Sequence, residues 1–208
     1  SQLIARVWTF DRDEQIDEAF FARRIKAAVE YRHFLKLDDP KGGCRLINSE
    51  ADGLPGLVVD RYAGVLVIQI TSAGIEFHRD TIVKLLAEIT GAASIYERSD
   101  VNVRAKEGLA ERSGLLYGAQ PPNPVIIEEN GARFAVDVRH GQKSGFYFDQ
   151  RGARAAVAAY ADGRTVLNAF SYTGAFAVSA LLAGAGHVIN IDSSAPALKQ
   201  AAHNLEMN

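Results

Sequence analysis

The spacing of hydrophobic residues changes along this chain, and the change separates two kinds of predicted structure. Over residues 13–37 the apolar positions recur three, four or seven apart among charged residues, which predicts an amphipathic helix. Turn-forming residues at 39–43 end this helix. Short apolar runs then predict strands over 45–48, 57–62 and 65–71. The last two strands flank Ala63-Gly64, a connection short enough for a hairpin.

The residues that follow continue to mix helix and strand signals. A helical period returns over 76–90 and is followed by Gly91, a residue that suits the position after a helix C-terminus. A further strand is predicted over 94–97. Asn130-Gly131 is a strong hairpin signal. The strands of that hairpin are predicted over 125–129 and 132–138.

From residue 149 onward, helices and strands alternate. The predicted elements are a helix over 149–160, a strand over 165–169, a helix over 174–182, a strand over 187–191 and a helix over 195–207. This alternation predicts a parallel sheet with helices on both faces. Two strands alone would leave sheet edges and faces exposed, so we expect the α/β domain to need more residues than this chain supplies. A proline cluster at 120–124 indicates a boundary between the two regions.

The composition is that of an ordinary folded protein, without an overall basic field. The 208 residues are 48% hydrophobic and 23% charged, and 23 Lys and Arg stand against 25 Asp and Glu, for a net charge of −2. This excludes disordered, collagen-like and disulfide-scaffold classes. Any contact with nucleic acid must come from a local patch. Residues 133–154 give a weak indication of one, with five Lys or Arg against two Asp or Glu.

Cysteine and histidine usage excludes the common metal and disulfide classes. Cys44 is the only cysteine, so the chain has no intrachain disulfide and no cysteine-based zinc site. The histidines show no metal-ligand spacing, and the longest apolar stretches are far shorter than the roughly 20 residues of a membrane-spanning helix. We therefore expect a cytoplasmic protein with no metal and no membrane segment, in which Cys44 is structural.

A strand, a turn and a helix over 166–176 form a pattern typical of nucleotide cradles. Gly174 lets the backbone approach a ligand, and Asp192 follows the next strand, where a carboxylate can accept the hydroxyls of a ribose. Because Phe170 and Tyr172 replace the further glycines of a dinucleotide site, the loop suits an adenosyl ligand without phosphates better than NAD. The alternative is that Gly174 only permits close packing and Asp192 caps the following helix.

A second segment, 138–151, combines glycines, aromatic residues and polar groups just before a predicted helix. Its polar groups could converge on the same cradle and add contacts to a ligand there. The alternative is that Asp149 caps the helix, while the aromatic side chains pack and the basic ones are solvated.

Five stretches, spread over nearly the whole chain, are similar to one known family. They are ARVWTF at 5–10, DGLPGL at 52–57, IYERSD at 95–100, KSGFYFDQR at 143–151 and VLNAFSYTGAFAV at 166–178. On these stretches the chain resembles the RlmI-type S-adenosylmethionine-dependent methyltransferases of 23S ribosomal RNA, which modify cytosine at C5. The resemblance implies a cytoplasmic enzyme with S-adenosylmethionine as cofactor and ribosomal RNA as partner, and it leaves room for a homodimer.

The family plan also implies a fold class and domain boundaries. The fold class is α/β, with a central α+β domain of antiparallel hairpins over residues 1–124. A hairpin and the start of a Rossmann-like class I methyltransferase domain follow over 125–208. In this plan Ser1 falls at the tail of an RNA-binding PUA domain, and Asn208 falls after the second methyltransferase strand. Both ends are therefore expected to continue in a longer protein.

The resemblance assigns roles to individual residues. The loop after the strand at 165–169 resembles the first methyltransferase motif, Asp192 resembles the ribose-binding acid, and 143–151 resembles the segment that covers the cofactor. The expected cofactor contacts are Tyr147, Asp149, Gln150, Asn168, Phe170, Ser171, Tyr172, Gly174 and Asp192. The expected RNA contacts are Arg139, Lys143 and Arg151.

Methylation at C5 needs a group that this sequence does not provide at the cradle. C5 of cytosine becomes nucleophilic only after a thiolate adds to C6. The family carries that cysteine in a Ser-Cys-Ser motif, with an Asp-Pro-Pro motif near the target base, and neither occurs here. We therefore expect no catalytic residue within this chain and place both motifs beyond Asn208.

Other functions stay open at this point. Methylation of another base position, such as a guanine nitrogen, would need no thiol. A binding module could retain the cradle and contact RNA without turnover. A nicotinamide-dependent oxidoreductase is disfavoured by the single glycine of the loop.

Overall fold

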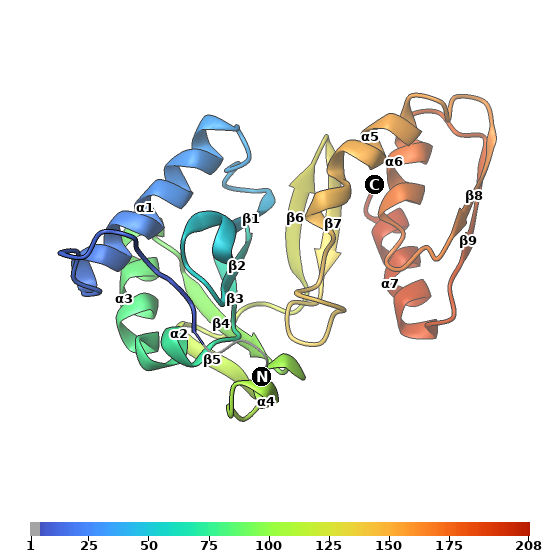
Figure 1. The fold of residues 1–208 in the computed structure, drawn as a ribbon. Coiled ribbons are helices and arrows are strands. Elements are labelled where there is room, and N and C mark those ends of the chain that lie inside the picture. Colours follow the sequence, from blue (N-terminus) through green and yellow to red (C-terminus); the bar gives the residue numbers. More distant parts are fainter. Residues whose placement is uncertain (1–4) are drawn as a thin grey trace.

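The computed structural model describes residues 5–208. Ser1, which the family plan places at the tail of a PUA domain, lies outside the described residues together with residues 2–4. The described chain forms a central sheet covered by helices on one face and by a hairpin on the other, followed by a C-terminal layer of helices and strands (Figure 1).

The central sheet is mixed, with five strands in the order β1-β2-β3-β4-β5. Its strands are β1 (Gly43–Asn48), β2 (Leu57–Tyr62), β3 (Val65–Ile70), β4 (Ser94–Ser99) and β5 (Arg112–Gly118). The helices of this region are α1 (Glu18–Phe34), α2 (Ala73–Phe77), α3 (Arg79–Thr90) and α4 (Val103–Lys106). Within this described sheet only β3 and β4 are parallel neighbours, because α2 and α3 connect the end of β3 to the start of β4 at the opposite edge of the sheet. The hairpin predicted at Ala63-Gly64 is confirmed by the pairing of Tyr62 with Val65.

Helices α1 and α3 cover one face of this sheet and bury the main core (Figure 1). The core includes Phe20, Phe21, Ile25, Leu46, Leu57, Ile68, Ile82, Leu86 and Ile95. The Asp17 side chain caps α1 by accepting a hydrogen bond from the Phe20 N–H, so the helix begins at Glu18 and not at the predicted residue 13.

Three elements of this region differ from the sequence prediction, one of them the short helix α4, which was not predicted. The helix predicted over 76–90 is two helices, because Ser72 caps α2 and the chain turns at His78 before α3 begins. Strand β5 was not predicted. It is a half-exposed edge strand interrupted by Gly114 and ending in Gly118, so it lacks the alternating apolar pattern that would have marked it.

A hairpin packs against the other face of the central sheet. Its strands are β6 (Val125–Glu129) and β7 (Ala132–Val136). The predicted turn is confirmed: Asn130 and Gly131 have φ values of 52° and 81°, the left-handed conformation that this tight turn requires. Phe134 of the hairpin shares a hydrophobic cluster with Tyr62 and Val67 of the sheet. Since the hairpin also contacts the C-terminal layer, the boundary after residue 124 stays a prediction.

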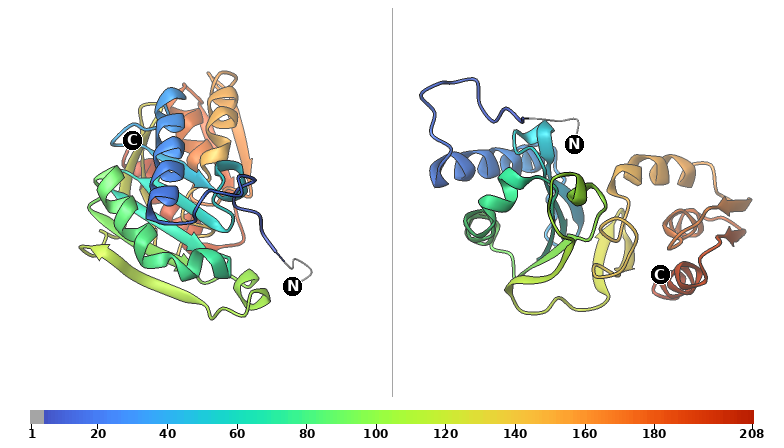
Figure 2. Two further views of the ribbon diagram at one scale, coloured as in Figure 1. Left: turned by 60° about the vertical axis from the view of Figure 1, so that its left-hand side comes forward. Right: turned by 60° about the horizontal axis from the view of Figure 1, so that its bottom comes forward.

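The C-terminal layer confirms the predicted alternation of helices and strands. Its elements are α5 (Arg151–Ala158), β8 (Thr165–Ala169), α6 (Ala175–Leu182), β9 (His187–Ile191) and α7 (Ala195–Glu206). Strands β8 and β9 are parallel, and α6 and α7 lie between them and the hairpin (Figures 1 and 2). The buried Asn204 of α7 fixes this arrangement, because its amide accepts from the Ala135 N–H and donates to the Thr173 carbonyl.

A buried polar network joins the central sheet to the segment that precedes α5. Arg45 forms an ion pair with Asp60 at 2.8 Å. The Ser144 hydroxyl donates to the Asp60 carboxylate and accepts from the Tyr62 hydroxyl at 3.0 Å. Asp60, Tyr62 and Ser144 are all buried, so the central sheet and this segment form one packed structure.

Two negative findings apply to residues 5–208. None of the helices there is long and apolar enough to cross a membrane. No group of three or more His, Cys, Asp and Glu side chains in this range is arranged to hold a metal ion.

Candidate functional site

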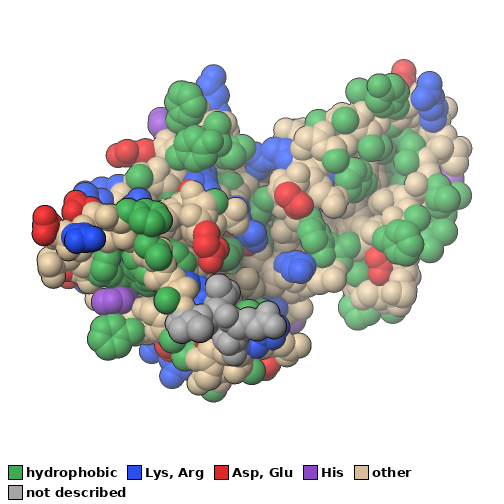
Figure 3. Space-filling view, in the orientation of Figure 1, with side chains coloured by type: hydrophobic (Ala, Val, Ile, Leu, Met, Phe, Trp, Pro, Cys, Tyr) green, Lys and Arg blue, Asp and Glu red, His purple; other side chains and the backbone are tan. Residues whose placement is uncertain are grey.

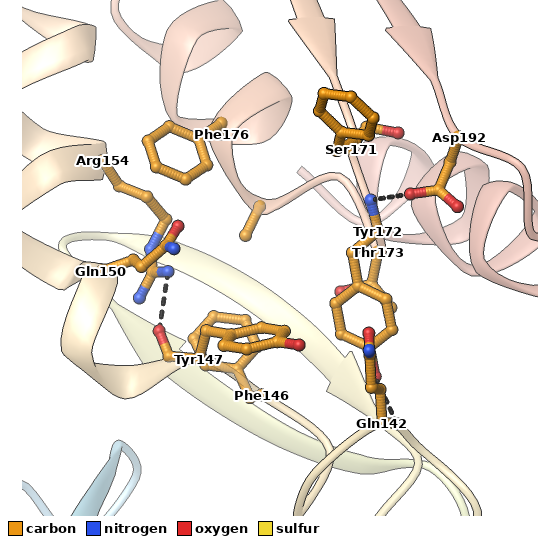
Figure 4. Close-up of a pocket in the computed structure, with 12 residues that line it drawn as sticks. Gln142, Phe146, Tyr147, Gln150, Arg154, Ser171, Tyr172, Thr173, Phe176 and Asp192 are labelled. Carbon is orange, nitrogen blue, oxygen red and sulfur yellow. Dashed lines mark hydrogen bonds between the residues drawn. The ribbon is translucent and has the colours of Figure 1, made fainter.

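A pocket of about 340 Å³ lies at the carboxyl ends of β8 and β9 (Figure 4). One side is formed by the loop after β8 and the start of α6, and the other by the segment before α5 and the first turn of that helix. The lining residues are Gln142, Phe146, Tyr147, Gln150, Arg154, Phe170, Ser171, Tyr172, Thr173, Ala175, Phe176 and Asp192. The carboxyl edge of parallel strands is where open α/β sheets bind their ligands.

The loop after β8 has the backbone of a glycine-rich cradle, with glycine at only one of its left-handed positions. Phe170, Tyr172 and Gly174 have φ values of 58°, 46° and 75°, so every second residue is left-handed. This conformation costs a residue other than glycine about 1–2 kcal/mol, and such strain concentrates at binding sites. The sequence concealed this feature, because aromatic side chains rarely adopt positive φ.

The Asp192 carboxylate lies at the pocket edge and holds the loop in place (Figure 4). It accepts hydrogen bonds from the Ser194 N–H and the Tyr172 N–H, each at 2.8 Å. These backbone donors, with that of Ser194 the stronger influence, lower the pKa of Asp192. The carboxylate is therefore ionised at neutral pH and able to accept ligand hydroxyls.

The Tyr172 side chain anchors the opposite wall. Its hydroxyl accepts from the Gln142 N–H at 2.9 Å and donates to the Gly145 carbonyl at 3.2 Å, and its ring meets that of Tyr147 edge-on. Burial raises the pKa of Tyr172, which keeps the hydroxyl protonated as a donor. Arg98 of β4 holds the same wall from the central sheet by donating to the Gly141 carbonyl.

Tyr172→Phe tests this anchor. Losing two hydrogen bonds while keeping the ring should lower the free energy of unfolding by about 1–2 kcal/mol, as measured by urea unfolding. Tyr160→Phe is the matched control, since Tyr160 is exposed and its hydroxyl makes no hydrogen bond with the described residues. Equal stability of the two variants would show that the Tyr172 hydroxyl does not hold the wall.

A buried ion-pair cluster shapes the α5 side of the pocket. Glu129 accepts from Arg154 Nε at 2.6 Å and Nη2 at 2.9 Å, and from Arg151 Nε at 3.0 Å. The third nitrogen of Arg154 donates to the Tyr147 carbonyl at 3.0 Å, and the guanidinium lies 4.7 Å from the centre of the Phe146 ring. All three nitrogens of Arg154 are thus engaged, so it orders the wall and is not a free cation for a phosphate.

The structure brings most of the predicted cofactor contacts together, and places three elsewhere. Tyr147, Gln150, Phe170, Ser171, Tyr172 and Asp192 line the pocket. Asp149 faces a separate groove, and the Asn168 amide donates to Asn190 across the β8–β9 pair at 2.8 Å. At Gly174 an added Cβ would lie 2.8 Å from the Cβ of Ala201 on α7, so this glycine permits close helix packing.

The predicted RNA contacts also divide. Lys143 and Arg151 line the separate groove, which has a volume of about 810 Å³. Arg151 is partly engaged there, with Glu129 and with the Gly43 carbonyl at 2.7 Å. Arg139 donates to the Pro121 carbonyl at 2.5 Å and lines neither the pocket nor the groove.

The sequence prediction missed half of the pocket. The missed residues are Gln142, Phe146, Arg154, Thr173, Ala175 and Phe176. Two of them carried a usable signal. Phe146 adjoins Tyr147 in the aromatic segment. Arg154 follows Gln150 by four residues, so Gln150 and Arg154 face the same side of a helix.

Cys44 lies on β1, outside the pocket, with 3% of its surface exposed. Burial raises the pKa of its thiol, so little thiolate forms at neutral pH. This agrees with a structural role.

The polar groups of the pocket fit a nucleoside-type ligand that lacks phosphates. Ser171 is buried, and its hydroxyl has no partner among residues 5–208, which leaves it available to a ligand. No side chain caps the N-terminus of α6 at Gly174, so the first N–H groups of the helix favour a carboxylate there. With Asp192 for hydroxyls and aromatic rings for an apolar body, these groups suit an adenosyl amino acid.

Comparisons with known proteins point to the same chemistry. A family model described as S-adenosylmethionine-dependent methyltransferase matches residues 52–208. The chain is similar to the ribosomal RNA large subunit methyltransferase I of Aeromonas hydrophila, with 54% identity over 100% of this chain and 53% of the relative. The chain therefore spans about half the length of the curated relatives that it matches.

Solved structures show the same likeness. A Streptococcus mutans protein described as a SAM-dependent methyltransferase matches with a TM-score of 0.81 and 26% identity, over 95% of this chain and 50% of that one. A methyltransferase structure complexed with SAH matches with a TM-score of 0.82 and 26% identity, over the same shares of 95% and 50%.

Proposed function

The chain belongs to the family of S-adenosylmethionine-dependent methyltransferases, and we propose that its pocket binds S-adenosylmethionine for methylation of ribosomal RNA by the whole protein. The observation that carries this proposal is the pocket at the ends of β8 and β9. It combines a left-handed loop, an ionised Asp192 and the unpartnered hydroxyl of Ser171.

Each part of the pocket has a role in this proposal. Asp192 accepts the ribose hydroxyls of the cofactor, and the rings of Tyr147 and Phe176 enclose its apolar parts. The Ser171 hydroxyl and the N-terminus of α6 hold the amino-acid end. The cofactor supplies an electrophilic methyl group on a sulfonium. The task of these residues is to orient that group and to exclude water from it.

Ribosomal RNA is the proposed substrate, with C5 of a 23S cytosine as the modified atom. The name of the Aeromonas hydrophila relative, at 54% identity, supports an RNA of the large subunit. Reaction at C5 needs a thiolate. Because Cys44 is buried with a raised pKa, we place the nucleophile in the part of the whole protein that this chain does not contain. We also place the protein in the cytoplasm; a homodimer stays a prediction.

The test uses the complete protein. Titration calorimetry should detect binding of S-adenosylmethionine to the protein. 23S RNA incubated with the protein and S-adenosylmethionine should yield 5-methylcytidine on nucleoside analysis. If the RNA yields methylated guanine instead, the protein is still a methyltransferase and the assignment to cytosine C5 is wrong. RNA binding without methyl transfer would favour the binding module, and thermal stabilisation by NAD alone would favour an oxidoreductase.

A further inference from the structure

A second hollow lies beside the cofactor pocket and is more than double its size, about 810 Å³ against 340 Å³. We infer that it binds a single-stranded segment of the substrate RNA and leads it to the cofactor pocket. We call it the inter-lobe groove, because it lies between two lobes, the central sheet with its helices and the segment that leads into the C-terminal layer. One wall is the end of α1 with β1, including Tyr31, Arg45 and Asn48, and the other is the segment 143–152. The inference rests on the proposed function and adds the path of the substrate.

The inter-lobe groove and the cofactor pocket share a wall. Phe146 and Tyr147 line both hollows, so a single thickness of chain separates them. That wall is fixed by Arg154, which donates to the Tyr147 carbonyl and stacks on the Phe146 ring. An RNA segment lying in the groove would therefore pass directly beside the bound cofactor.

The charges at the groove favour a polyanion. Arg32, Arg45, Lys143 and Arg151 line it, and Asp149 is the one exposed carboxylate among its described lining residues. Figure 3 shows Lys and Arg side chains in the hollow between the central-sheet region and the C-terminal layer. In a chain of net charge −2, this is the kind of local patch that phosphate binding needs.

The four cations differ in how far they are neutralised, and Arg32 is fully engaged, because it donates to both carboxylate oxygens of Asp52. Arg45 pairs with Asp60 and Arg151 with Glu129, and both of these carboxylates are buried behind the arginines. Arg45 and Arg151 each use Nε and Nη2 in their hydrogen bonds within residues 5–208, which leaves Nη1 for a phosphate oxygen. Lys143 forms no ion pair with the described residues, so all of its ammonium is available to a phosphate, and Asp149 is the one carboxylate of the lining that is likewise without an ion pair there.

Aromatic and amide groups in the groove favour unpaired bases. Tyr31 is 54% exposed at the rim, and the Arg32 guanidinium lies 5.6 Å from its ring centre and supports it from one side. An exposed ring of this kind stacks on bases that have left a helix, which a duplex does not offer. Asn48 and Gln69 add amides that can both donate and accept.

Charge reversal and ring removal in the complete protein test the inference. The probe is a short fluorescent single-stranded RNA, followed by anisotropy over a range of salt concentrations. Lys143→Glu should weaken binding about tenfold and reduce the slope of log affinity against log salt by about 1 or more. Tyr31→Ala should weaken binding about tenfold with little change in slope, since stacking carries no charge. Lys106→Glu, on α4, is the matched control and should bind like the unmodified protein.

Two further measurements separate this inference from the proposed function. Both groove variants should retain their melting temperature and their affinity for S-adenosylmethionine, because neither residue lines the cofactor pocket. If the unmodified protein binds the RNA and neither Lys143→Glu nor Tyr31→Ala loses RNA affinity, the groove is not the RNA site, and the proposed function is unaffected. Tighter binding of a duplex than of the single strand would also overturn it. Failure of the unmodified protein to bind S-adenosylmethionine would instead contradict the proposed function.

Discussion

Replacing Glu129 by alanine is expected to lower the free energy of unfolding by about 3–5 kcal/mol, because it leaves charges in the interior without a partner. Glu129 is 6% exposed and Arg154 is 2% exposed. The glutamate also neutralises Arg151, which ties α5 to the Gly43 carbonyl of β1. Its loss should therefore loosen the contact between the C-terminal layer and the central sheet as well as one wall of the cofactor pocket.

Urea unfolding of the complete protein measures this effect, with Glu128→Ala as the control. Glu128 is the exposed neighbour on the same strand, and its side chain makes no ion pair with the described residues, so its replacement should change stability by less than about 0.5 kcal/mol. Glu129→Gln retains the shape of the side chain and loses its charge, so its free energy of unfolding should lie between those of Glu129→Ala and Glu128→Ala. Equal stability of Glu129→Ala and Glu128→Ala would show that the cluster is not a stabilising element.

Asp192→Ala is expected to weaken binding of S-adenosylmethionine by about 10- to 100-fold, the size of one or two hydrogen bonds to a charged acceptor. Titration calorimetry on the complete protein measures the loss. Ser194→Ala is the control, because its hydroxyl caps α7 and does not line the pocket. Since the Ser194 and Tyr172 N–H groups lower the pKa of Asp192, the loss of affinity on acidification should have its midpoint below the usual pKa of an aspartate.

A cofactor analogue distinguishes direct contact from support of the loop. Asp192 also accepts from the Tyr172 N–H, so its removal could act through the loop alone. If the carboxylate binds the ribose, a 2′-deoxy analogue should bind more weakly than the cofactor to the unmodified protein and equally well to Asp192→Ala. An equal loss of affinity for the analogue in both proteins would remove Asp192 from the list of ribose contacts and leave it as a positioning residue.

The elements with strong local signals were predictable from the sequence. Ala63-Gly64 and Asn130-Gly131 both form the predicted hairpin turns, since short turns depend on the few residues within them. Strand β5 was missed because an edge strand with Gly114 in its middle is defined by its pairing with β4, a contact distant in sequence. The α1 boundary was wrong by five residues at its start because Asp17, and not the apolar period, decides where the helix begins.

The candidate site was predictable in outline and not in detail. The strand-turn-helix pattern located the loop and Asp192, because both follow directly from the ends of β8 and β9. The spacing from Gln150 could have placed Arg154 on the pocket side of α5, but its ion pair could not be foreseen, because Glu129 comes from a hairpin 25 residues earlier. Gly174 fits the alternative that the sequence had left open, because the nearest atoms to it belong to α7.

The left-handed residues of the cradle loop decide whether the loop loses its conformational entropy during folding or when the ligand binds. A loop with glycine at 170 and 172 would sample many backbone states in the free protein and would have to give them up when the ligand arrives. Phe170 and Tyr172 have fewer states to begin with, and the hydrogen bonds of Tyr172 to Asp192 and to the Gly145 carbonyl hold Tyr172 in one. The loop is therefore preorganised during folding, and the ligand encounters a cradle already close to its bound shape.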